Sequence, residues 1–92
     1  MYATQVTVQI EPGREEEARQ GLMEQVLPEV KGTPGIIGGY WFAPEGTEGT
    51  SVILWDTREH AEAVADYLRQ SPHPTAPVTI EQVEVHEVIA TI

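Results

Sequence analysis

The sequence predicts an α+β fold in which four strands and two helices follow one another in the order β-α-β-β-α-β. Three observations support this prediction: segments in which apolar and polar residues alternate, segments in which apolar residues recur every three or four positions, and breaks rich in proline and glycine between them. Right-handed connections then place both helices on one face of a four-stranded antiparallel sheet. This is the order of ferredoxin-like folds, and a chain of 92 residues suits one domain, residues 1–92.

The first strand and the first helix are predicted from residues 2–32. Alternation predicts a strand over residues 2–10, with four large side chains on one side: Tyr2, Val6, Val8 and Ile10. A helix is predicted over residues 14–32, because acidic residues fill its first turn and four apolar residues recur at intervals of four: Ala18, Leu22, Val26 and Val30. Pro28 predicts a kink or an end in this helix.

A hairpin is predicted next, with strands over residues 35–43 (GIIGGYWFA) and 50–55 (TSVILW) and a turn at residues 44–49. Gly38 and Gly39 lie side by side inside the first of these strands. Glycine inside a strand marks a bulge or a close approach of another group, and a simple bend at the sheet edge fits equally well. The sequence therefore leaves open which side chains of this strand share a face.

The second helix is predicted to begin at Asp56, because Glu59 follows three residues later as in a capping box. Its buried side is predicted from apolar residues at helical spacing: Ala61, Val64, Ala65 and Leu68. Prolines end this helix at residues 71–77. The last strand, residues 78–92, changes the phase of its alternation after Ile80, which predicts a bulge or a bend.

Composition excludes several classes of partner. Fifteen acidic and five basic residues give a formal net charge of −10, so we expect neither nucleic acid nor an anionic membrane surface as a partner. There is no cysteine, hence no disulfide and no thiolate site. The N-terminal residues lack the basic start and apolar run of a signal peptide, and we expect a cytoplasmic protein.

Patterning also predicts a homodimer. Two helices cover one face of the sheet only, and the hairpin strands carry apolar or aromatic side chains on the other face as well, whichever phase they adopt. A second copy of the chain is the simplest cover for such a face.

Three features resemble the dimeric α/β-barrel superfamily, and within it the antibiotic-biosynthesis-monooxygenase-like (ABM-like) domains: Pro-Gly before the first helix (EPGREEEARQGL), Pro-Gly before the second strand (TPGIIGGYWF), and an aromatic residue before an acid-capped helix (SVILWDTREHAEAVADYL). The resemblance spans nearly the whole chain. It implies a homodimer with a pocket between the sheet and the helices of each subunit. Some members oxygenate aromatic polyketides without metal or flavin, so it implies no cofactor. Other members degrade haem with the help of an asparagine, and the absence of asparagine here argues against haem.

Five residues are candidates for ligand binding: Gly38, Gly39, Tyr40, Trp41 and Trp55. The tryptophans would form a stacking wall for a flat ring, but aromatic pairs on adjacent strands are also ordinary packing material. The adjacent glycines would leave room for the ligand. A small apolar or aromatic ligand is the expected partner.

Two histidines are candidates for proton transfer, His73 and His86. His73 lies between two prolines after the second helix, where ABM-like relatives have the pocket mouth, although a histidine in such a loop is commonly only solvated. His86 is expected to face the barrel interior or the dimer contact, and His60 the solvent. His86 and Glu84 share a strand face without a third ligand, so we expect no metal.

Two functions remain open at this point. One is a small-molecule-binding, ABM-like protein that acts as a cofactor-independent monooxygenase on an aromatic or polyketide-like substrate. The other is a non-catalytic dimerisation or ligand-sensing module.

Overall fold

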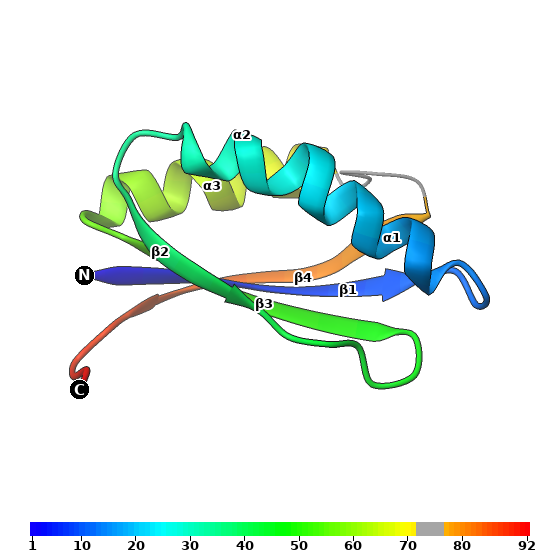
Figure 1. Cartoon of the computed structure of the whole chain (residues 1–92). Coiled ribbons are helices and arrows are strands. Elements are labelled where there is room, and N and C mark those ends of the chain that lie inside the picture. The colour runs from blue at the N-terminus through cyan, green and yellow to red at the C-terminus, as the bar shows by residue number, and fades with distance from the viewer. Residues whose placement is uncertain (72–76) are drawn as a thin grey trace.

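The computed structural model describes residues 1–71 and 77–92 and confirms the predicted order of strands and helices. Four strands form one antiparallel sheet in the order β2-β3-β1-β4, and the helices lie on one of its faces (Figure 1). The strands and helices have these bounds: β1 Tyr2–Ile10, α1 Glu15–Gly21, η1 Leu22–Val26, α2 Leu27–Lys31, β2 Ile36–Trp41, β3 Glu48–Trp55, α3 Arg58–Gln70 and β4 Val78–Glu87. No helix among the described residues is long and apolar enough to cross a membrane.

The strand register defines two sheet faces. Val6 lies opposite Ser51 on β3 and Val83 on β4, and these side chains point toward the helices, on what we call the inner face. The outer face carries the intervening residues, among them Val52 and Leu54 of β3. The register of β4 shifts against β1 next to Thr7 and Val8, which confirms the bulge predicted after Ile80.

The strand β2 contains a second irregularity, between Ile36 and Gly38. Beyond it Gly39 pairs with Ile53 and Trp41 with Ser51, so both lie on the inner face. Gly38 and Tyr40 pair with Leu54 and Val52 and lie on the outer face. The bulge thus decides the phase that the sequence left open.

The first helix, as we call α1, η1 and α2 together, is helical throughout residues 15–31. Pro28 does not end it. The turn that precedes Pro28 is π-helical: the Leu27 N–H donates to the carbonyl of Leu22, five residues back. Proline lacks an N–H and its ring crowds the carbonyl four residues earlier, and a widened turn relieves that crowding.

The start of α3 differs from the prediction. Thr57, and not Asp56, is the N-cap, and its Oγ1 accepts a hydrogen bond from the His60 N–H at 3.2 Å. Asp56 instead places Oδ1 2.6 Å from His60 Nδ1. Asp and Thr are both good caps, and the Asp56 carboxylate finds a side-chain partner within the same turn.

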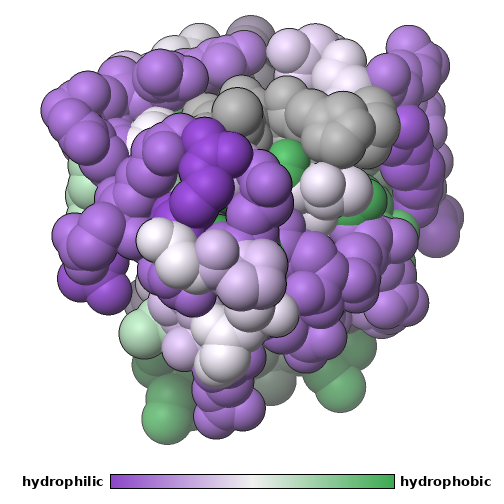
Figure 2. All heavy atoms as spheres, turned by 90° about the vertical axis from the view of Figure 1, so that its right-hand side faces the viewer, coloured by the Kyte–Doolittle hydropathy of each residue, from purple (hydrophilic) through white to green (hydrophobic). Residues whose placement is uncertain are grey.

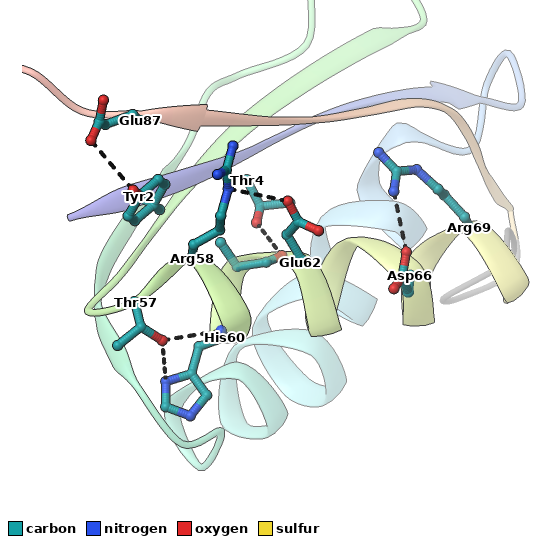
Figure 3. Close-up of polar contacts among 10 residues, drawn as sticks. Tyr2, Thr4, Thr57, Arg58, His60, Glu62, Asp66, Arg69 and Glu87 are labelled. Atoms are coloured by element: carbon teal, nitrogen blue, oxygen red, sulfur yellow. Dashed lines mark hydrogen bonds and ion pairs between the residues drawn. The ribbon is translucent and has the colours of Figure 1, made fainter.

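The helix α3 packs closely on the inner face. Its Ala61 and Ala65 are fully buried, at 0% exposure. The hydroxyl of Thr4 on β1 donates to the Ala61 carbonyl at 3.0 Å (Figure 3). Small side chains at these two positions let the helix backbone approach the sheet.

Candidate functional site

A cavity of about 920 Å³ lies on the inner face of the sheet. The first helix contributes Leu22, Met23, Val26 and Val30 to its lining, and α3 contributes Val64, Tyr67 and Leu68. Its floor is formed by inner-face residues of all four strands: Val6, Val8, Ile10, Trp41, Gly49, Ser51, Ile53, Trp55, Val78 and Ile80. The π-helical turn therefore lies directly over the cavity, and most of the lining is apolar.

The two predicted tryptophans border this cavity, and Tyr40 does not. Trp41 and Trp55 both lie on the inner face, whereas Tyr40 is on the outer face with 63% of its surface exposed. Trp55 is fully buried, and its indole N–H has no hydrogen-bond partner in the described part of the chain. A buried donor without a partner costs about 1–3 kcal/mol, so the unpaired indole N–H of Trp55 destabilises the core.

The two glycines have different surroundings. A Cβ atom at Gly39 would lie 3.0 Å from Cζ3 of Trp41 and 3.1 Å from the carbonyl oxygen of Val52, so glycine here lets the indole lie flat against the strand. A Cβ atom at Gly38, on the outer face, would meet nothing within 4 Å. The close approach expected of a strand glycine is thus made at Gly39, by the protein's own Trp41.

Among the described residues that line the cavity, Ser51 is the one buried residue with a hydroxyl, and no motif in the sequence marks it. Ser51 lies on the floor opposite Trp41 and is 7% exposed. No described residue makes a hydrogen bond with its hydroxyl. Its position in TSVILW, with the same parity as Ile53 and Trp55, was the signal that could have identified it as an inner-face polar residue.

The charged residues that border the cavity all come from the first helix. They are three acids, Glu15, Glu16 and Glu29, and one base, Arg19, in the part of the chain that the structure describes. The rim thus carries a formal charge of −2, of the same sign as the whole chain. Figure 2 shows one end of the molecule as a mainly hydrophilic surface with apolar residues visible in its recesses.

The histidines lie outside this cavity as far as the structure describes them. His86 projects from the outer face, where Nε2 lies 3.3 Å from Oε1 of Glu84. His73 lies outside the described residues. Within these, no group of three histidine, cysteine or acidic side chains could hold a metal ion.

His60 belongs to a polar cluster at the start of α3 (Figure 3). The hydrogen bond with His60 lowers the pKa of the Asp56 carboxyl, more strongly than partial burial raises it. Gly35, with φ of +87°, passes so close to the His60 ring that any side chain at this position would collide with it. The cluster therefore joins the turn before β2 to the start of α3.

Comparison with known proteins identifies the fold. No family model matches the chain, and no curated protein does. Among solved structures, the haem degrader MhuD of Mycobacterium tuberculosis, with two haems bound in its active site, has a TM-score of 0.70 at 16% identity, over 100% of this chain and 99% of that chain.

Two further structures have the same fold. The monooxygenase ActVA-Orf6 of Streptomyces coelicolor, in complex with nanaomycin D, has a TM-score of 0.61 at 13% identity, over 99% of this chain and 89% of that chain. A dimeric ferredoxin-like protein from an uncultured marine organism has a TM-score of 0.66 at 10% identity, over 100% of this chain and 98% of that chain. The chain therefore shares the ferredoxin-like fold of these three structures, which is the fold that the resemblance in its sequence implied.

Proposed function

We propose that the protein binds a flat, uncharged and largely apolar small molecule in the cavity between the first helix and the sheet. The observation that supports this most is the cavity itself: about 920 Å³, with an apolar floor and two tryptophans, in a chain of 92 residues. Ligand cavities are typically about 300–1,000 Å³ and mostly apolar with few polar groups. Structures of the same fold hold nanaomycin D and haem, which are flat molecules.

The acidic rim supports an uncharged ligand. An anion that approaches the cavity would meet Glu15, Glu16 and Glu29 against the single cation of Arg19. The net charge of the chain adds to this repulsion, which salt would screen.

Calorimetric titration with three naphthalene probes tests this proposal. We expect 1-naphthol, which is neutral, to bind with saturation, and 1-naphthalenesulfonate to bind at least several-fold more weakly at low salt. The difference in affinity between the two probes should become smaller as salt is added. Absence of saturable binding by any probe, 1-naphthylmethylammonium included, would refute the proposed function. Tighter binding of the sulfonate would refute the part that concerns charge.

We also propose that the protein is a homodimer joined through the outer sheet faces. Tyr40 and, on the edge strand, Ile37 are exposed, and Val52 and Leu54 beside Tyr40 are only half-buried. Figure 2 shows hydrophobic residues along the lower edge of the molecule, on the side of the sheet away from the helices. Contiguous apolar patches of this kind mark interaction sites, and a neighbour of the same fold is a dimeric protein.

Sedimentation equilibrium at micromolar concentration tests the dimer. We expect a mass of about twice the 10.2 kDa of one chain, and a Leu54→Glu variant should sediment as a monomer because it would bury a charge in the contact. Gln70→Glu, on α3, adds the same charge on the other side of the sheet and should leave the mass unchanged. A monomeric parent protein would exclude the homodimer.

A second candidate function is cofactor-independent oxygenation of the bound ligand, which the monooxygenase of the same fold favours. For 1-naphthol the reaction with O₂ would give 1,4-naphthoquinone and water: one oxygen atom becomes the new carbonyl, the other leaves as water, and the naphthol supplies all four electrons. The protein would exclude bulk water and move protons. The assignment of that role to His73 or His86 stays a prediction.

Oxygen consumption in the presence of 1-naphthol tests the activity. Turnover above the protein-free rate, depressed by His73→Ala, would support both the oxygenation and the role of His73. His86→Ala tests the other candidate, and because His86 lies on the sheet face away from the cavity, we expect this change to depress turnover less than His73→Ala. Saturable binding without oxygen consumption would favour the non-catalytic, ligand-sensing function.

A further inference from the structure

The inner face of the sheet contains two buried hydroxyl residues, and they differ in one respect. Thr4 is 0% exposed and its hydroxyl donates to the Ala61 carbonyl at 3.0 Å. Ser51 is 7% exposed, and no described residue makes a hydrogen bond with its hydroxyl. Buried polar groups in folded proteins are nearly always hydrogen-bonded. The Ser51 hydroxyl is not among the fully enclosed atoms without a partner, so it is open to the cavity, whereas the Thr4 hydroxyl is paired within the protein.

The position of Ser51 accounts for this difference. It borders the cavity, on the central strand β3, and lies opposite Val6 on one side and Trp41 on the other. Along its own strand the inner-face neighbours are Gly49, which has no side chain, and Ile53. The side chain of Val8 fills the space at Gly49, where a Cβ atom would lie 3.1 Å from Val8 Cγ2. The floor of the cavity is thus mainly apolar, and Ser51 supplies a hydroxyl to it beside the indole groups of Trp41 and Trp55.

A ligand that fills this part of the cavity separates the hydroxyl from water. It must then offer a hydrogen-bond partner of its own, or leave the hydroxyl buried and unpaired. A serine hydroxyl donates one hydrogen bond and accepts others, so it pairs equally with a carbonyl or a hydroxyl oxygen. A ligand of the same shape without such an oxygen would be disfavoured, because sites built around a polar group discriminate strongly against analogues that lack its partner.

We propose that Ser51 is a specificity-determining residue of the cavity, and that its hydroxyl selects flat apolar ligands that carry a hydroxyl or carbonyl oxygen. This inference rests on the proposed function, since it assumes that the cavity holds a small molecule. It adds that Ser51 recognises the ligand and that the recognised group is a hydroxyl or carbonyl oxygen. The role is one of recognition and requires no catalytic step.

A matched pair of probes tests the proposal: 1-naphthol and 1-methylnaphthalene, in which a methyl group replaces the hydroxyl at nearly constant shape. Calorimetric titration of the parent protein should show a clear preference for 1-naphthol. In Ser51→Ala we expect the affinity for 1-naphthol to fall by about 2- to 10-fold, as for the loss of one hydrogen bond. The affinity for 1-methylnaphthalene should stay equal or rise, so the preference should largely disappear.

Thr4→Val is the control, because it removes the other buried hydroxyl of the inner face, which does not border the cavity. It should reduce stability and leave the preference between the two probes intact. If Ser51→Ala weakens both probes equally, or changes neither, the proposed role of Ser51 is wrong while ligand binding stands. If the parent protein binds neither probe, the proposed function fails, and the role of Ser51 fails with it.

Discussion

The two helical segments cover the same face of the same sheet, and yet one packs tightly while the other leaves a cavity. The helix α3 places Ala61 and Ala65 against β1, β3 and β4 with no exposed surface. The first helix packs on the sheet near its two ends, with Ala18 against Ile10 and Val78, and Val30 against the cluster of Ile53 and Trp55, and between these contacts it borders the cavity. Alanine at successive contact positions permits close packing, and its absence along most of the first helix goes with open volume.

The backbone of the two helices also differs, and α3 is the more regular and better capped of the two. The helix α3 begins at a Thr57 side-chain cap, whereas Arg14 at the start of the first helix makes no side-chain cap hydrogen bond. The first helix also contains the π-helical turn Leu22–Val26 before Pro28, and π-turns are frequent at functional sites. We call the closely packed region around α3 the tight side and the region where the first helix borders the cavity the hollow side. The tight side thus contributes most to the stability of the fold, and the hollow side contains the candidate site.

The largest expected effect is on the tight side. Ala65→Leu inserts a larger side chain where there is no free volume, and we expect the free energy of unfolding to fall by about 1–3 kcal/mol. Ala63→Leu, at an exposed position of the same helix that borders the cavity, should stay within about 0.5 kcal/mol of the parent protein. Urea denaturation of both variants measures the difference. Equal losses would mean that α3 packs no more tightly at Ala65 than at Ala63.

A smaller effect on stability is expected on the hollow side. Val26→Phe places a ring in existing open volume, so we expect a change in unfolding free energy below about 1 kcal/mol. The same ring occupies the ligand's space, and the affinity for 1-naphthol should fall by at least about tenfold. Glu24→Phe is the control, because it lies in the same π-turn but does not border the cavity. Unchanged naphthol binding by Val26→Phe would show that ligands bind elsewhere.

The smallest effect concerns the start of α3 and its dependence on pH. His60 holds the pKa of Asp56 below its ordinary value of 3.8, so the pair contributes stability above that pH, and the contribution is lost as the pH falls through the lower, folded-state value. The difference in unfolding free energy between the parent protein and Asp56→Asn should therefore shrink between about pH 5 and pH 2. Glu45→Gln, in the hairpin loop, controls for the loss of one negative charge. A difference that is constant over this range would contradict the prediction.

The order of strands and helices was predictable because it depends on local periodicity. The apolar residues of β1 and of α3 recur at strand and helix spacing, and the structure places both sets on the inner face. The bulge in β4 was visible as a change of phase. Each of these signals lies within one segment of about ten residues, so no knowledge of tertiary contacts was needed.

The candidate site was only partly predictable, because it depends on contacts between segments. The bulge beside Ile36 decides that Trp41 and not Tyr40 faces the cavity, and the sequence around Gly38 permits either phase. Ser51 was missed because a serine in a strand has no special pattern. Its importance appears only in the structure, where the Thr4 hydroxyl has a hydrogen-bond partner and no described residue pairs with the Ser51 hydroxyl.

Gly39 offers a route to proteins with altered ligand size in which no cavity-lining residue is replaced. Because the Val52 carbonyl blocks one direction, a methyl group added at position 39 would lift the Trp41 indole off the sheet and into the cavity. The available space would shrink from behind the ring, without any new chemical group in contact with the bound molecule. Natural variation at this single position would therefore shift the accepted range of ligand dimensions while leaving the recognition chemistry untouched.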